Sequence, residues 1–139
     1  MVPTVYQILD ITHKAWHAGQ FNEGSIGVDI CQQAGVEWYD HYLEHEYDLD
    51  IFDNPSSRGP RKVLTLNAKL RDAVSVFCVD LLNALDLKIV PAPTASGAYV
   101  QDVKKGNISL YGHSHVNKRK WDIAPFYDDI IEGINQTRV

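Results

Sequence analysis

The chain has 139 residues, of which 45% are hydrophobic, and this is enough for one domain with a single core but hardly for two. Its net charge is −5, from 13 Lys and Arg against 18 Asp and Glu, which argues against general nucleic-acid binding and against binding to anionic membranes, because both need a basic surface. The two cysteines, Cys31 and Cys78, are too few for a disulfide framework and lie in apolar stretches, so we expect buried, reduced thiols.

Two short strands are predicted in the first third of the chain, at residues 4–10 and 25–31, because both are rich in β-branched and aromatic residues. Residues 36–63 follow and contain His41 and His45 at the helical spacing of a metal pair. Their continuing acidic charge favours a solvated, partly helical loop instead. A role of this segment in substrate or partner contact is the less favoured interpretation.

A long amphipathic helix is predicted over residues 65–87, with Thr65 as its N-cap. A buried strand follows at 87–90, ended by the prolines at 91 and 93, and a further strand at 108–112 would carry a histidine at its end. Pro125 suits the first turn of a closing helix. Together these elements predict a single α/β domain over residues 1–139, with a mixed central β-sheet packed by the long helix and the C-terminal helix.

The segment Gly112-His113-Ser114-His115-Val116, followed by Lys120-Trp121-Asp122, brings together the groups that zinc hydrolases use. Histidine nitrogens and a carboxylate hold the ion, while an open position keeps a water whose pKa falls to about 7. A nearby lysine can stabilise the oxyanion that forms when this water attacks a carbonyl. If the chain stays extended, His113 and His115 face the same side; if it turns, His115 lies behind the metal ligands.

Asp29 stands on an otherwise apolar predicted strand. An unpaired carboxylate is costly to bury there, so the residue should either have a partner or serve acid–base chemistry.

The order of these motifs resembles the type 2 family of zinc-dependent N-acetylmuramoyl-L-alanine amidases, whose fold is shared with phage lysozyme-like amidases and peptidoglycan recognition proteins. The resemblance covers most of the chain except residues 36–63, which form a family-atypical insertion. The matching segments are Val5-Tyr6-Gln7, Ala15-Trp16-His17-Ala18-Gly19, Asn22, Ser25-Ile26-Gly27-Val28-Asp29, Thr65, Gly112-His113 and Lys120-Trp121-Asp122.

The resemblance implies hydrolysis of the amide bond between N-acetylmuramic acid and L-alanine in peptidoglycan. Zinc would be held by His113 and Asp122, with Asp29 as general base and Lys120 as the cation that stabilises the oxyanion. The residues implied in substrate contact are Trp16, His17 and Asn22. No signal peptide or long apolar run is visible, so we expect a protein made in the cytoplasm that acts on the cell wall after export or release. Its expected partner is peptidoglycan rather than nucleic acid or membrane.

Three departures from the family pattern leave alternatives open. The family's first zinc-binding histidine precedes the Val-Tyr-Gln strand, where this chain has Met1-Val2-Pro3-Thr4. His115 replaces an acidic residue, and Asp29 stands where glutamate is frequent. The resemblance therefore leaves three alternatives: a truncated amidase, an amidase whose site another imidazole such as His115 completes, or a degenerate relative that binds without cutting. A missing first strand would also leave the 4–10 strand with an open edge and favour self-association.

Overall fold

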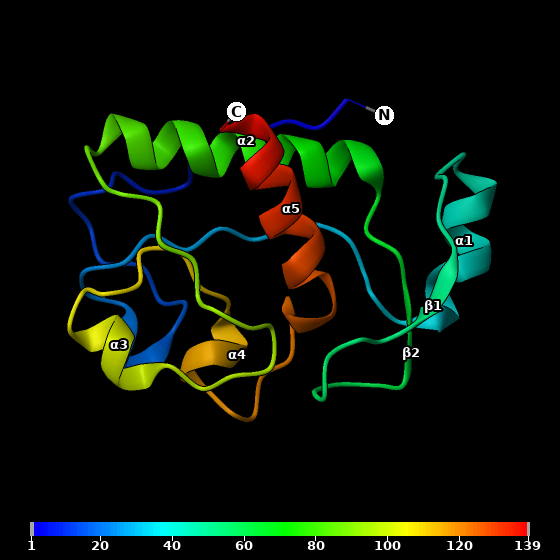
Figure 1. The fold of residues 1–139 in the computed structure, drawn as a ribbon. Coiled ribbons are helices and arrows are strands. Elements are labelled where there is room, and N and C mark those ends of the chain that lie inside the picture. Colours follow the sequence, from blue (N-terminus) through cyan, green and yellow to red (C-terminus); the bar gives the residue numbers. More distant parts are fainter. Residues whose placement is uncertain (1, 139) are drawn as a thin grey trace.

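The computed structural model describes residues 2–138, which form a mixed structure of helices and one small antiparallel sheet (Figure 1). No helix among these residues is long and apolar enough to cross a bilayer. The helices and strands are α1 (Tyr39–Glu44), β1 (Ile51–Asp53), β2 (Lys62–Leu64), α2 (Ala68–Ala84), α3 (Val100–Lys104), α4 (His113–Val116) and α5 (Tyr127–Thr137), with short 3-10 turns at Gly19–Phe21, Val36–Trp38 and Ala124–Phe126.

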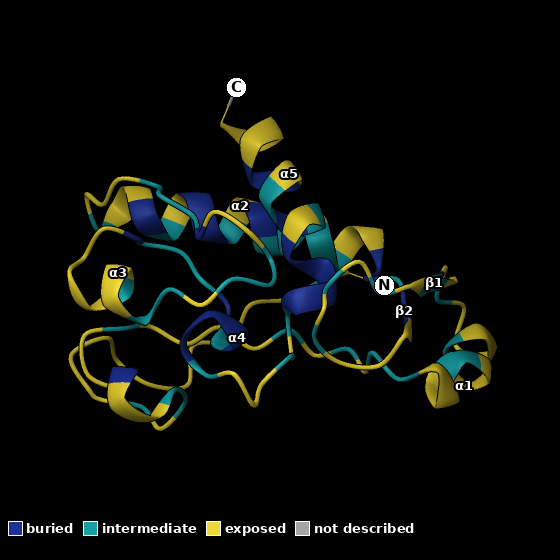
Figure 2. Cartoon of the chain, turned by 60° about the horizontal axis from the view of Figure 1, so that its bottom comes forward, coloured by how far each residue is buried: buried dark blue, intermediate teal, exposed yellow. Residues whose placement is uncertain are grey.

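The main core lies where α5 crosses α2 (Figure 1). Both helices place apolar residues at helical spacing, so each presents one buried face to the other and one exposed face to water (Figure 2). The backbones approach closely at Gly133, where an added Cβ would overlap the Ser75 hydroxyl. The buried residues of this core are Leu66, Cys78, Val79, Phe126, Ile130 and Ile134.

Both predicted helices are present, with shifted boundaries. The long helix begins after Asn67, whose side-chain oxygen accepts hydrogen bonds from the backbone N–H groups of Lys69 at 3.0 Å and Leu70 at 3.3 Å. Thr65 is therefore not the N-cap; its hydroxyl instead accepts a hydrogen bond from the backbone N–H of Asp50. At the C-terminus, Pro125 lies in the 3-10 turn that leads into α5.

The end of α2 is a Schellman motif whose left-handed position is Asp86, with φ at 55°. The N–H of Leu87 donates to the carbonyl of Leu82 at 2.9 Å, and the N–H of Asp86 donates to Asn83 at 3.1 Å. These bonds end the helix three residues before the predicted boundary.

We expect Asp86→Gly to raise the free energy of unfolding by about 0.5–1 kcal/mol, because glycine adopts positive φ without the steric cost that a Cβ brings. Losing an acid at the negative end of the helix acts in the same direction. Urea denaturation compares the variant with Asp86→Ala, which keeps the Cβ and should gain less. Equal stability of the two variants would contradict this account.

The predicted central sheet is wrong: within residues 2–138 the sheet consists of β1 and β2, which lie in the segment that was expected to be a loop. The two strands pair antiparallel, with Phe52 opposite Val63, and the N–H of Asn54 donates to the carbonyl of Arg61 at 2.8 Å to close the connection. Val63 and Leu64 are both fully buried, so β2 is covered on both of its faces. The helical part of the expectation for residues 36–63 is met by α1.

The predicted strands at 87–90 and 108–112 reduce to a single parallel bridge between Pro91 and Leu110. The N–H of Ala92 donates to Leu110, but proline has no N–H to continue the ladder. The Ser109 hydroxyl also satisfies backbone groups that a strand partner would otherwise pair: it accepts from Val90 N–H at 2.8 Å and donates to the Lys88 carbonyl at 2.6 Å. The two segments therefore lie side by side without forming a regular sheet.

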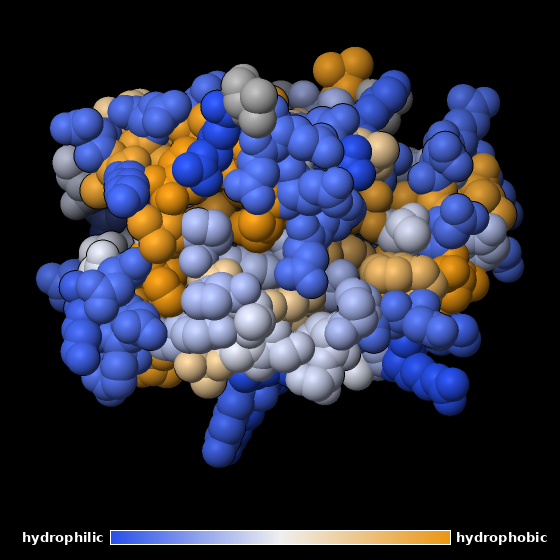
Figure 3. Space-filling view, in the orientation of Figure 1, coloured by the Kyte–Doolittle hydropathy of each residue, from blue (hydrophilic) through white to orange (hydrophobic). Residues whose placement is uncertain are grey.

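Neither predicted strand near the N-terminus, at 4–10 or 25–31, is formed. Neither segment has a strand partner among residues 2–138 whose backbone groups would complete a ladder. Both expose apolar side chains, as for Tyr6 and Ile8, which are 81% and 92% exposed. Hydrophobic residues interrupted by polar ones also reach the surface on the face in Figure 3. Self-association through an open strand edge thus has no formed strand at 4–10 to use, and it stays a prediction.

The two cysteines differ in their surroundings, so the expectation of two buried thiols holds for only one of them. Cys78 is a free thiol inside the main core, and burial raises its pKa to about 11. Cys31 is also free but exposed.

Candidate functional site

The structure brings His113 and Asp122 into direct contact. His113 is the first residue of α4, and its Nδ1 lies 3.1 Å from Oδ2 of Asp122. The turn that returns the chain begins with the Lys120 N–H donating to the carbonyl of Asn117. Gly112 is required beside this pair, because an added Cβ there would overlap the Ile123 side chain.

The separation of 3.1 Å suits two chemical arrangements. In one, the Nδ1–H of His113 donates to Asp122, which orients the ring and leaves Nε2 as a free ligand atom. In the other, Nδ1 and the carboxylate oxygen are neighbouring ligands of one ion, with metal–ligand distances of about 2.0–2.2 Å. The side chains are 25% and 58% exposed, so solvent and a ligand can reach both.

His115 lies behind this pair rather than beside it, because the chain turns into α4 instead of staying extended. The ring is fully buried; its Nδ1 accepts from Gly112 N–H at 2.8 Å, so Nε2 carries the proton and donates to the Thr94 carbonyl at 2.7 Å. Burial lowers the pKa of His115, and the positive charge of Arg58 acts in the same direction against the hydrogen bond to Thr94. To become a substitute metal ligand, this histidine would have to give up one of its two hydrogen bonds.

The residues predicted to contact substrate belong to one local unit, residues 15–27, which is held together by side-chain hydrogen bonds. Asn22 is buried, and its side-chain oxygen accepts from the N–H groups of His17 at 2.8 Å and Ala18 at 2.6 Å. The His17 ring lies with Nε2 at 2.8 Å from the Ser25 hydroxyl and covers Gly27, where a Cβ would come within 2.9 Å of it. Asn22 and His17 therefore hold the two N-terminal motifs together.

Trp16 is the exposed member of this unit. Its side chain is 87% exposed, and the Lys14 ammonium lies 5.6 Å from its ring centre. An aromatic face left open to solvent in this way is available to a ligand.

Packing joins the N-terminal unit to the segment that carries His113. The rings of Phe21 and Tyr111 meet edge to face with their centres 6.3 Å apart. Burial raises the pKa of Tyr111, against the smaller effect of a hydrogen bond with Ser25. The two motif regions therefore lie against each other, although about 90 residues separate them in the chain.

The two predicted catalytic residues, Asp29 and Lys120, are both exposed. Within residues 2–138, neither side chain makes a hydrogen bond or ion pair, and none links either of them to His113 or Asp122. The burial that motivated the interpretation of Asp29 is thus not observed: residues 26–29 are exposed throughout.

Arg58 is a residue of this region that sequence reasoning missed. Its guanidinium donates to the Ser114 carbonyl and, at 3.4 Å, to the Asn117 carbonyl, so it binds the open C-terminal end of α4. Gly59 follows at φ +87°, and a Cβ there would meet the Trp121 ring at 2.7 Å. The sequence shows Arg58 and Gly59 in a turn-rich loop, but it does not show that Arg58 binds carbonyl groups 56 and 59 residues further along the chain.

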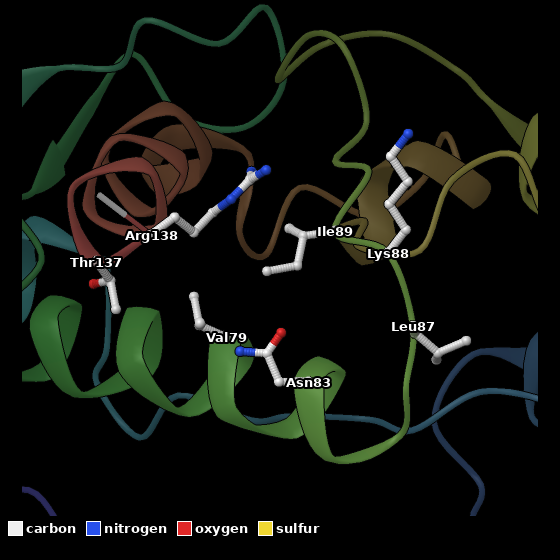
Figure 4. A pocket seen from close by; sticks show the side chains of 7 residues that line it. All are labelled: Val79, Asn83, Leu87, Lys88, Ile89, Thr137 and Arg138. Atoms are coloured by element: carbon white, nitrogen blue, oxygen red, sulfur yellow. The ribbon is translucent and has the colours of Figure 1, made fainter.

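Two hollows of the surface are relevant to the site. One borders α4 and includes Ser114, whose buried hydroxyl has no hydrogen-bond partner within residues 2–138. The other lies between the end of α2 and the end of α5, with Lys88 and Arg138 at its rim, and none of the predicted site residues lines it (Figure 4).

The described residues contain no cluster of three or more His, Cys, Asp or Glu side chains placed to hold a metal ion. The two residues predicted as zinc ligands, His113 and Asp122, are one short of the three protein ligands of a typical catalytic zinc site. Comparison of the chain with protein-family models, with curated proteins and with solved structures finds no match in any of the three.

Proposed function

We propose that this chain is a relative of the type 2 N-acetylmuramoyl-L-alanine amidases that hydrolyses the amide between N-acetylmuramic acid and L-alanine in peptidoglycan. The contact between His113 and Asp122 carries the proposal. These two residues were singled out from the sequence as zinc ligands, and they are nine positions apart yet in contact. The packing of Phe21 on Tyr111, which brings the second motif region to the same part of the molecule, supports it further.

The residues present fit part of a zinc site. His113 and Asp122 would hold the ion, which would supply a water of lowered pKa and a polarising charge for the amide carbonyl. Both side chains are accessible, and their donor types, imidazole nitrogen and carboxylate oxygen, are those that zinc accepts.

The chain's own residues divide the remaining tasks. Trp16 offers an open ring surface on which a sugar or a peptide stem can lie. Lys120, exposed and without a side-chain partner among the described residues, is free to approach developing negative charge. Asp29, exposed as well, is assigned the role of general base.

The second candidate function is a catalytically degenerate peptidoglycan-binding or phage-structural module, which binds without cutting. The two-ligand set favours it, because a site short of one ligand holds zinc less firmly than a complete one. The discriminating experiment incubates the protein, with zinc supplied, with purified peptidoglycan. Release of stem peptides that begin with L-alanine supports the amidase, whereas binding of the intact sugar-peptide without release supports the module.

His113→Ala is expected to remove the zinc held by the His113–Asp122 pair, and the parent chain should bind zinc at this pair more weakly than a three-ligand site does. Metal analysis after dialysis against a graded series of mild chelators measures this, with His13→Ala as control because it removes an exposed histidine elsewhere. Tight, equimolar zinc retained by the parent would show that another residue completes the site. Zinc retention unaffected by His113→Ala would contradict the assignment of the ligand.

A further inference from the structure

The segment around α1 contains a pair of histidines that the proposed function does not use. His41 and His45 are exposed, and their ring centres are 4.5 Å apart with the ring planes 38° from each other. The helical spacing of four residues places both rings on one side of the helix. We propose that His41 and His45 form a second metal site, which binds one first-row divalent cation such as Cu²⁺ or Zn²⁺ through two imidazole nitrogens.

Hydrogen bonding prepares His45 to act as a ligand. Its Nδ1 lies 2.8 Å from the carbonyl oxygen of His41, which can only accept, so Nδ1 carries the proton and donates. The lone pair is then on Nε2. A backbone carbonyl that fixes the tautomer in this way is the usual support of a metal-binding histidine. Neither ring nitrogen of His41 has a hydrogen-bond partner among the described residues, so that ring is free to offer a nitrogen as well.

The backbone under the pair is held in place. Helix α1 ends at Glu44 with His45 as its C-cap, and a Schellman motif follows, in which the N–H of Tyr47 donates to Tyr42 at 3.0 Å and the N–H of Glu46 donates to Leu43 at 3.1 Å. Because these bonds fix the C-terminal turn, the backbone loses little conformational entropy when the second imidazole binds an ion that the first already holds. The second contact is then intramolecular, which strengthens binding over a single histidine.

The charge around the pair favours a cation. Residues 37–50 include six acidic residues and no Lys or Arg. Imidazole nitrogen is a good ligand for Cu²⁺ and Zn²⁺, and affinity follows the order in which Cu²⁺ exceeds Zn²⁺. With two protein ligands, water fills the remaining positions, so this is an exposed, exchangeable site.

Trp38 provides a local readout, because its ring centre lies 5.5 Å from that of His41. Cu²⁺ bound by the pair should quench the fluorescence of Trp38. The titration uses the full chain carrying His113→Ala, so that the His113–Asp122 pair does not contribute. Trp38→Phe in the same background identifies how much of the quenching comes from this ring rather than from Trp16 or Trp121.

In the His113→Ala background, His41→Ala and His45→Ala should each weaken Cu²⁺ binding about tenfold or more, because each converts a two-point site into a one-point site. His13→Ala, which removes a distant exposed histidine, should leave the titration unchanged. Zn²⁺ should raise the unfolding temperature of the background protein, and either substitution should remove this rise, since only binding to the folded state stabilises it. Binding unaffected by one or both substitutions, or quenching that persists in Trp38→Phe, would overturn the proposal.

Discussion

Ile134→Ala is expected to lower the free energy of unfolding by about 2–5 kcal/mol, the usual cost of removing a large aliphatic side chain from a packed core. Ile134 is fully buried in the core between α2 and α5. The loss has two sources: the transfer free energy of the removed methyl and methylene groups, and the cavity that neighbouring side chains fill only in part. Because native stability is typically about 5–15 kcal/mol, this substitution removes a large share of the total.

Two variants of the same helix serve as controls for Ile134→Ala. Ile134→Val removes one methylene and should cost about 0.5–1.5 kcal/mol. Asn135→Ala changes the next, exposed residue and should stay within about 0.5 kcal/mol of the parent. Urea denaturation followed by far-UV circular dichroism gives all three values. A cost of Ile134→Ala below that of Ile134→Val would mean that α5 is not packed on α2 as described.

The helices could be predicted from the sequence because their signals are local. The apolar period of α2 lies within the helix itself, and Pro125 and the acids Asp128 and Asp129 mark the start of α5. Boundaries were less certain: Asn67 and Thr65 are both acceptable caps, and only the tertiary partner of Thr65, the N–H of Asp50, decides between them.

The strands could not be predicted because a strand depends on a neighbour. Residues 4–10 and 25–31 have strand composition, but no segment in the described part of the chain pairs with them as a strand. The hairpin of β1 and β2 has strands of three residues, too short for an alternating pattern to be distinguished from a loop.

The sequence singled out His113 and Asp122, and the structure places them in contact. Their role as zinc ligands stays a prediction. The position of His115 depended on whether the chain turned after Gly112, which the sequence left open. Arg58 contacts a carbonyl 56 residues away, so no local pattern could reveal it.

Lys120→Ala is expected to reduce the turnover of amide hydrolysis by about 10²–10³-fold, as for other groups that stabilise an oxyanion, if this chain acts as the proposed amidase. The reason is that the negative charge appears on the carbonyl oxygen only in the transition state, so the lysine contributes little to binding the substrate. Binding of the intact muropeptide should therefore stay nearly unchanged. The fold should also survive, because the side chain is exposed.

The matched control is Lys118→Ala, which removes the same charge two residues earlier from a position that is also exposed. It should leave turnover close to that of the parent, since general surface charge acts weakly through screening salt. Release of L-alanine-bearing stem peptide from purified peptidoglycan, with zinc supplied, measures turnover, and binding of the intact sugar-peptide is measured in parallel. Equal losses of binding and turnover in Lys120→Ala would reassign Lys120 to substrate recognition. A group that stabilises the oxyanion must act from one position. Equal losses of turnover in both variants would therefore show that the positive charge of this loop, and not the position of Lys120, supports catalysis.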